Sequence, residues 1–344
     1  MALLAAAAIA AIGLGVGLGL RGTGSGGTPG GRRTAGGRHR GAAGPSTTTH
    51  TAPTSTAAPG ATGPGTATPA TPAGAGPPHL MLVMLENHGY GQIVGSPAAP
   101  YLNHLIARYG LATASYADTH PSLPNYIDIV SGSTQGIASD CTDCTADAPQ
   151  VVDQLQQAGI GWGAYFEAMP APCDTGTGPA PYDKNHNPFV HAPHLVDDAT
   201  ECAHVVPYSR LAPELADGTA PPFIWVTPDV LHDMHTGTVA QGDTWLSEQL
   251  PTVLHSSWYA DGGTIVITFD EGVTDAGCCG GAGGGHIATI VVSAATPPGA
   301  RMATPVDHAG VLRTIEELYR LPFLGAAANP SSGTLLPLLG RSPG

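Results

Sequence analysis

Three short apolar runs, each followed at once by acidic or amide side chains, constrain the fold of this chain more than any other feature. The runs and the residues after them are LMLVML (80–85) before Glu86-Asn87, FIWVT (223–227) before Pro228-Asp229, and TIVITF (264–269) before Asp270-Glu271. Runs this short and this apolar are typical of buried strands in a parallel sheet. Functional sites in such sheets form beyond the carboxyl ends of the strands, so we expect these oxygens to meet at one edge. The alternative is that the acids only mark turns that face solvent.

The rest of the chain after residue 78 alternates short apolar runs with longer helical stretches. A fourth strand is expected at 286–293, and helices are expected at 99–109, 147–158, 242–259 and 306–319. This alternation predicts an α/β fold with helices on both faces of a central, mostly parallel sheet.

Oxygen-rich groups of Asp, Glu and Asn bind hard divalent cations, and histidines extend the choice toward zinc, iron or manganese. The chain after residue 78 holds 13 histidines and a single lysine, Lys184. Asp233 and His235 follow the second apolar run closely. The sequence therefore predicts a divalent metal cofactor, whose identity it leaves open.

Ser122 is the candidate nucleophile, in the segment THPSLPNY. Pro121 and a second proline two residues after Ser122 restrict the backbone, which suits a hydroxyl held at a fixed angle. A serine next to a bound cation loses its proton more easily. The alternative is a proline-rich turn that opens a helix or strand. No GxSxG motif surrounds Ser122, which disfavours an α/β-hydrolase triad.

The first 78 residues differ in composition from the rest. Residues 1–20 are almost entirely apolar and end at Arg21, so residues 1–21 are expected to be a signal peptide or signal anchor. Residues 22–78 are rich in Gly, Thr, Pro and Ala, which predicts a disordered linker before a catalytic domain at 79–344. We expect a secreted or surface-tethered protein that touches the membrane only through its first residues. A buried helix of a cytosolic protein is the alternative.

Charge is also uneven along the chain. The first 78 residues contain five arginines and no acid, and all 26 acidic side chains follow them, against seven basic ones. A body this acidic repels nucleic acid, so nucleic-acid binding is excluded as a main function. An anionic substrate requires a local cation.

Six cysteines suit an oxidising compartment and allow up to three disulfides. They are Cys141, Cys144, Cys173, Cys202, Cys278 and Cys279. Bridges that join the 141–144 stretch to the 173–202 stretch would tie two loops bordering the expected site. Cys141 and Cys144 are also compatible with half of a zinc site, and Cys278 and Cys279 with a mutual bridge or free thiols.

Several long segments, in this order, resemble the phosphoesterase family of bacterial acid phosphatases and phospholipases C, a branch of the alkaline phosphatase superfamily. They are LENHGYGQIVG, THPSLPNYIDIVSG, YDKNHNPFV, TPDVLHDMHTGTVAQGDTWL, TIVITFDEG, GGGHIATIVVS and DHAGVLRTIEELYRLP. The resemblance covers about residues 79–325. It implies an alkaline-phosphatase-like fold and metal-assisted hydrolysis of phosphoesters.

The resemblance also implies roles for individual residues. The implied metal ligands are Glu86, Asn87, Ser122, Asp270 and Glu271. The implied catalytic residues are Ser122, as a nucleophile that becomes phosphorylated, Asn125, as a phosphate contact, and His186, Asp233 and His235, which line the phosphate pocket. We expect His235 to be the proton donor because histidine titrates near working pH. Further candidate phosphate contacts are His120, Lys184, Asp229 and His286.

Two departures from the family pattern bear on the substrate. Asn185 stands where the family has a basic residue, with Lys184 one place earlier, and Glu271 leads into GVTDAGCCGGAGGGH rather than an Asp-Gly-x-x-Asp-His continuation. Because this continuation is missing and the chain is short, we expect a phosphomonoesterase rather than a phospholipase C. The resemblance implies a small phosphoester or a phosphoinositide, including phosphatidylinositol 3-phosphate, as the substrate. The remaining alternative is a wall-tethered binding protein without turnover.

Overall fold

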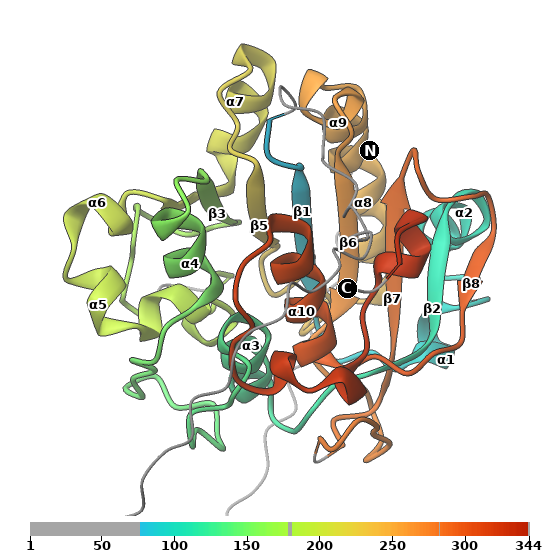
Figure 1. Ribbon diagram of the computed structural model, residues 1–344, viewed down its shortest axis with the longest axis horizontal. Helices are drawn as coiled ribbons and strands as arrows, with labels where there is room; N and C mark the ends of the chain where they lie inside the picture. The colour runs from blue at the N-terminus through green and yellow to red at the C-terminus, as the bar shows by residue number, and fades with distance from the viewer. Residues whose placement is uncertain (1–75, 178–180, 282, 343–344) are drawn as a thin grey trace, which may run out of the picture. The chain divides into compact units, whose positions relative to one another are not determined.

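The computed structural model describes residues 76–177, 181–281 and 283–342. Its helices pack around one eight-stranded sheet (Figure 1). The strand order is β4-β3-β5-β1-β6-β7-β2-β8, and only β7 runs antiparallel to its neighbours. The strands are β1 (Leu80–Leu85), β2 (Gly110–Tyr116), β3 (Trp162–Phe166), β4 (Val205–Pro207), β5 (Phe223–Thr227), β6 (Thr264–Phe269), β7 (His286–Ser293) and β8 (Ala300–Met302). The expected α/β fold with a mostly parallel sheet is confirmed.

Helices cover both faces of this sheet (Figure 1). They are α1 (Tyr90–Ile93), α2 (Pro100–Arg108), α3 (Ser122–Ser131), α4 (Val151–Gln157), α5 (Pro193–Val196), α6 (Ala199–Cys202), α7 (Leu211–Asp217), α8 (Val239–Leu254), α9 (Ser257–Ala260) and α10 (His308–Tyr319). Side chains of β1 alternate between two cores: Leu82 packs with α3, α4 and α10, whereas Val83 packs with α2, α7, α8 and α9. Since both faces of β1 are buried, its sequence is apolar throughout.

All four predicted strands lie at the predicted residues, whereas one predicted helix is interrupted. The helical pattern over 242–259 corresponds to α8, which ends at Leu254, and to the separate α9, which begins after Ser256. The Ser256 hydroxyl accepts a hydrogen bond from the Tyr259 N–H and caps α9. Sequence patterns missed the other four strands. Gly, Thr and Ser interrupt the apolar character of β2, Gly interrupts that of β3, and β4 and β8 are only three residues long.

The predicted signal segment at 1–21 lies outside the described residues, as does the predicted linker at 22–78 except for its last three residues. Within the described part of the chain, no helix is both long and apolar enough to span a bilayer.

Three disulfides are present, and each joins cysteines from the same stretch of chain. The pairs are Cys141–Cys144, Cys173–Cys202 and Cys278–Cys279. The pairing, which the sequence left open, joins no cysteine of the 141–144 stretch to the 173–202 stretch, and the zinc half-site does not form because its two sulfurs are bonded to each other. The Cys173–Cys202 bridge encloses the segment that carries His186.

Candidate active site

The residues that follow β1 and β6 meet at the carboxyl edge of the sheet, as expected from neighbouring parallel strands. The Asp270 N–H donates to the Leu85 carbonyl over 2.8 Å, and the Asn87 N–H donates to Asp270 Oδ1 over 2.8 Å. The Glu86 N–H donates to the Asp233 carbonyl over 2.8 Å. Glu86, Asp233 and Asp270 are all fully buried. Backbone contacts thus bring three carboxyl-bearing residues from distant parts of the chain to one place.

The Glu86 carboxylate is the acceptor at the centre of this cluster. The Ser122 hydroxyl donates to Glu86 Oε2 over 3.1 Å, and the Asn87 amide donates to the same oxygen over 3.0 Å. The Tyr126 hydroxyl donates to Glu86 Oε1 over 2.6 Å. Ser122 begins α3 and Tyr126 lies one turn later, so both side chains leave the same face of that helix.

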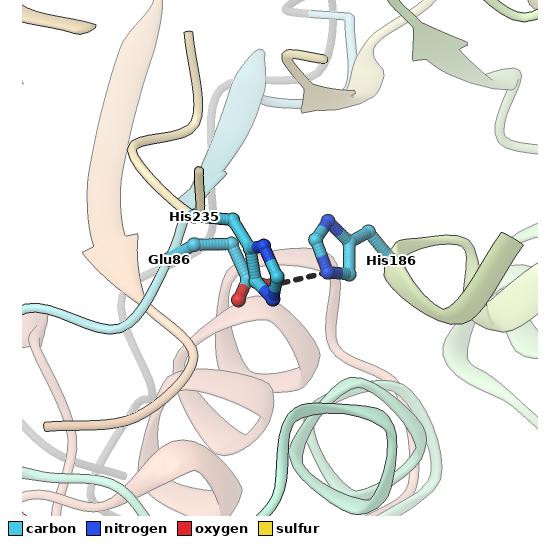
Figure 2. A group of neighbouring side chains, drawn as sticks. All are labelled: Glu86, His186 and His235. Atoms are coloured by element: carbon cyan, nitrogen blue, oxygen red, sulfur yellow. Dashed lines mark ion pairs between the residues drawn. The ribbon is translucent and has the colours of Figure 1, made fainter. Parts of the chain in front are cut away.

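Two histidines complete the cluster (Figure 2). His186 lies between two carboxylates: its Nδ1 atom is 2.8 Å from Asp233 Oδ2, and its Nε2 atom is 3.5 Å from Glu86 Oε1. The His235 N–H donates to Asp233 Oδ1, and the His235 ring centroid is 5.1 Å from that of His186. His186 is buried, whereas His235 is exposed. One ligand atom from each of Glu86, His186 and His235 lies within 4.8 Å of the others.

Burial and mutual repulsion raise the pKa of these carboxyls. Burial raises the pKa of Glu86 well above its ordinary value, and the charges of Asp270 and Asp233 raise it further, against the hydrogen bonds from Tyr126 and Ser122. Burial also raises the pKa of Asp233, opposed by His186. Burial lowers the pKa of His186, but the hydrogen bond to Asp233 and the charges of Asp233, Asp183 and Asp270 together outweigh burial, so that pKa is raised. Three buried carboxyls thus share a single buried imidazole, so added positive charge would stabilise their ionised forms.

A bound divalent cation would supply this positive charge. Asp270 Oδ2 is buried and has no hydrogen-bond partner, which is costly for a carboxylate oxygen unless a cation or a proton meets it. Among the ion pairs of the described residues, those of Glu86 and Asp233 involve only His186. Carboxylate, amide and hydroxyl oxygens from Glu86, Asp270, Asn87 and Ser122 are the donors that hard cations prefer, and the two imidazoles suit borderline metals.

Glu271, also expected to be a metal ligand, pairs with a histidine. His120 Nδ1 is 2.8 Å from Glu271 Oε2, and His120 Nε2 is 3.2 Å from the Thr274 carbonyl oxygen. Burial and the charge of Asp270 raise the pKa of Glu271 to about 7, against the effect of His120. His120 thus stands beside the cluster, two residues before Ser122, with its side chain about one-third exposed.

Asn125 shapes the backbone before Ser122. Its Oδ1 accepts from the N–H groups of Asp118 and Thr119, and its Nδ2 donates to the carbonyls of Thr119 and Pro121. Both hydrogens of the amide are engaged in these bonds, so Asn125 has no free donor for a phosphate in this structure. The expectation of a direct phosphate contact is replaced by a positioning role.

Three other candidate phosphate contacts have partners outside the cluster. Lys184 Nζ donates to the Thr142 carbonyl. The His286 ring stacks between those of Tyr90 and Tyr116, and its Nε2 is 3.0 Å from the Thr113 carbonyl oxygen. Asp229 Oδ1 accepts from the N–H groups of Leu231 and His232. The structure therefore does not bring Lys184, His286 or Asp229 into contact with Glu86.

Sequence reasoning missed two residues that organise the site, Tyr126 and Glu167. Glu167 follows β3 directly and accepts three hydrogen bonds: Oε2 accepts from the Asp229 N–H and pairs with His232 Nδ1, while Oε1 accepts from Trp245 Nε1. These bonds hold the turn that leads to Asp233 and His235. Two sequence features could have identified them: the four-residue spacing from Ser122 to Tyr126, and the acid that follows the aromatic run WGAYF.

This arrangement is suited to nucleophilic attack by a serine hydroxyl at a site rich in carboxylates. It combines a buried serine hydroxyl, a carboxylate that accepts its proton, and an exposed imidazole nearby. The hydroxyl lies at the N-terminus of α3, where the helix dipole favours an anionic group.

Comparisons with known proteins agree with this chemistry. The model of the phosphoesterase family matches residues 95–322. A phosphatidylinositol-3-phosphatase of Mycobacterium tuberculosis is 30% identical over 253 residues, which span 73% of this chain and 80% of that protein. An acid phosphatase of Aspergillus fumigatus is 28% identical over 254 residues, spanning 71% of this chain and 55% of that one.

A solved structure shows the same fold. It is that of an alkaline phosphatase superfamily protein from Vibrio parahaemolyticus, at a TM-score of 0.51 and 13% identity, covering 78% of this chain and 71% of that one. The family match covers most of the chain, the homologues are acid phosphatases, and the fold agrees with the superfamily. The chain is therefore a hydrolase that belongs to the phosphoesterase family, with an alkaline phosphatase superfamily fold.

Proposed function

We propose that this protein is a metal-dependent acid phosphatase that removes phosphate from phosphomonoesters through a phosphoserine at Ser122. The observation that carries the proposal is the hydrogen bond from the Ser122 hydroxyl to the buried Glu86 carboxylate, inside a group of three buried carboxyls that share a single buried imidazole. A hydrolase of this family needs a nucleophile or an activated water at such a place, and Ser122 is the side chain that meets the requirement.

In this scheme Glu86, Asp270, Asn87 and Ser122 hold the cation, with Glu271 beside them. When bound, the cation neutralises phosphoryl charge and lowers the pKa of a nearby hydroxyl. Glu86 accepts the hydrogen bond of the Ser122 hydroxyl and aims the oxygen.

The first chemical step is an in-line displacement at phosphorus. The Ser122 hydroxyl gives its proton to Glu86, and the Oγ–P bond forms as the bond from phosphorus to the ester oxygen breaks. The ester oxygen takes a proton from the protonated His235 imidazole. Asp233 orients the His186 ring through its Nδ1 and holds the backbone of His235 through its N–H. Water then attacks the phosphoserine and gives one proton to His235. The Oγ–P bond breaks as the serine oxygen takes back the proton held by Glu86, which releases phosphate and restores the hydroxyl.

Phosphatidylinositol 3-phosphate is the substrate we propose to test first, because a relative of 30% identity is named for it. The purified protein is dialysed against a chelator and reloaded with single divalent metals. Phosphate release is then measured from p-nitrophenyl phosphate and from phosphatidylinositol 3-phosphate, and headgroup release from phosphatidylcholine. Metal-restored release of phosphate supports the proposal. Greater activity on phosphatidylcholine indicates a phospholipase C, and no metal-dependent hydrolysis indicates a binding protein.

We also propose that the protein is exported. The support is the apolar run at residues 1–20 together with three disulfides among the described residues, which persist in oxidising compartments. Fractionation of producing cells, followed by alkylation and mass spectrometry of the recovered protein, tests this. Intracellular protein with free thiols would contradict export.

A further inference from the structure

The first turn of α3, which carries Ser122, has no cap from the residue before it. That residue is Pro121, whose side chain accepts no hydrogen bond. An acceptor is supplied instead from further along the chain: the Leu123 N–H donates to Asp140 Oδ1 over 2.9 Å, across 17 positions. A carboxylate at this end of a helix satisfies an unpaired N–H group and meets the positive end of the helix dipole. Asp140 therefore holds the backbone of the residue that follows Ser122.

The loop that carries Asp140 also packs on the same turn. It comprises residues 140–144, and the Cys141–Cys144 disulfide closes it. Both cysteines pack against an apolar cluster that contains Leu123 and Ile127 of α3. The 140–144 loop thus contacts the start of the helix through a hydrogen bond and through apolar packing.

The 140–144 loop is fastened in turn to the segment that carries His186. Lys184 Nζ donates to the Thr142 carbonyl over 2.7 Å, and Asn185 Nδ2 donates to the Asp140 carbonyl over 3.4 Å. Two residues next to His186 therefore hold the loop that caps α3. The loop links the helix that begins at Ser122 to the segment of the buried histidine.

We propose that Asp140 is a positioning residue for the reaction: its carboxylate fixes the first turn of α3, so that the Ser122 hydroxyl stays aimed at Glu86 and at the incoming phosphorus. This inference rests on the proposed role of Ser122 as the nucleophile. The Ser122 hydroxyl lies 3.1 Å from Glu86 Oε2, so a small shift of the turn weakens this contact. Asn125 holds the backbone before Ser122, and Asp140 holds the backbone after it.

The expected effect is on the rate of reaction rather than on substrate binding. A displacement of a reacting group by about 1 Å costs up to about a hundredfold in rate. Asp140→Ala should therefore lower kcat by about ten- to a hundredfold at saturating metal, and change KM by less than about threefold.

Two substitutions separate the hydrogen bond of Asp140 from its charge. Asp140→Ala removes both, whereas Asp140→Asn keeps an amide oxygen that accepts from the Leu123 N–H. The charge has an effect of its own, because after burial and the charge of Asp270 it also raises the pKa of Glu271. A positioning role predicts that Asp140→Asn retains kcat within about threefold of the wild type. Asp143→Ala, which changes an exposed acid of the same loop, is the matched control and should retain the wild-type kcat.

The test measures kcat and KM for p-nitrophenyl phosphate in these metal-loaded variants, together with thermal unfolding and with hydrogen exchange of the peptide that covers residues 121–131. Asp140 is exposed, so its replacement should leave the core folded. The Leu123 amide should exchange faster in Asp140→Ala than in the wild type and in Asp140→Asn. Adding Asp140→Ala to Ser122→Ala should lower the residual hydrolysis no further, since the group that Asp140 positions is then absent.

Three results would overturn the proposal. A loss of kcat in Asp140→Asn as large as in Asp140→Ala would assign the effect to charge. A kcat above about a third of the wild-type value in Asp140→Ala, in an enzyme that Ser122→Ala inactivates, would refute the positioning role alone. If Ser122→Ala remains active, the proposed function fails, and this inference fails with it.

Discussion

Replacing Tyr126 with phenylalanine isolates one hydrogen bond at the centre of the proposed site. The Tyr126 hydroxyl donates to Glu86 Oε1 over 2.6 Å, and both residues are fully buried. Phenylalanine keeps the ring, which stacks on His186 at a centroid distance of 5.5 Å. A hydrogen bond to a charged group contributes about 1.5–3 kcal/mol. At about 1.4 kcal/mol per pKa unit, its loss should raise the pKa of Glu86 by about 1–2 units.

The consequence should appear in the pH dependence of activity. Cation binding and acceptance of the Ser122 proton both require ionised Glu86, and a higher pKa leaves less of the ionised form at a given acidic pH. The acidic limb of kcat/KM for p-nitrophenyl phosphate should therefore move to higher pH by about 1–2 units. The free energy of the lost hydrogen bond also opposes metal binding, so the metal affinity at a fixed acidic pH should fall by about tenfold or more.

Tyr165→Phe is the matched control. The Tyr165 hydroxyl donates to Glu214 of α7, a pair of the same kind outside the site. This variant should lose stability but keep the pH profile and the metal affinity of the wild type. If Tyr126→Phe leaves both the acidic limb and the metal affinity unchanged, Glu86 is not the ionising ligand and the reasoning is refuted.

Three further predictions concern the turn before Asp233, the pH dependence of stability and one disulfide. Glu167→Gln should lower kcat by up to about tenfold at unchanged metal content, because it weakens the bonds that hold this turn; unchanged kcat would contradict that. Burial raises the pKa of Glu316 to about 8. The unfolded chain therefore ionises first, and stability falls as pH rises from about 5 to about 8. Glu316→Gln should flatten this fall in thermal unfolding, and an equally steep fall would refute the assignment. Replacing Cys173 and Cys202 together with alanine should lower the free energy of unfolding by about 3–4 kcal/mol, measured in urea, because their bridge closes a 29-residue loop; a loss below about 1 kcal/mol would count against a stabilising role.

The strands and the acidic residues that follow them could be predicted because both depend on the local sequence. Buried parallel strands require continuous apolar runs, and neighbouring parallel strands end at the same edge, so Glu86 and Asp270 had to meet. Helix spacing could also have predicted Tyr126, since a side chain four residues after Ser122 shares its face of α3. The helix itself was the ambiguous element, because a proline-rich turn was an equal alternative.

What could not be predicted depends on side-chain direction and on long-range packing. Lys184 and His186 are two residues apart, yet the first bonds to a surface carbonyl and the second is buried between two carboxylates. The cysteine pairs show the same limit, since fifteen pairings of six cysteines are equivalent until the chain is folded. Asp140 also reads as an ordinary loop residue in the sequence. Its contact with the Leu123 N–H arises only when the 140–144 loop packs on the first turn of α3.

The most direct test of the central claim is to trap the phosphorylated enzyme. Metal-loaded protein is mixed with a phosphomonoester, quenched with acid within milliseconds, digested and analysed by mass spectrometry. The account predicts one added phosphoryl group on the peptide that contains Ser122, absent in Ser122→Ala, whose hydrolysis should fall by several orders of magnitude while its thermal unfolding remains that of the wild type. Hydrolysis above about a tenth of the wild-type rate in Ser122→Ala, or a phosphoryl group on another residue, would contradict it.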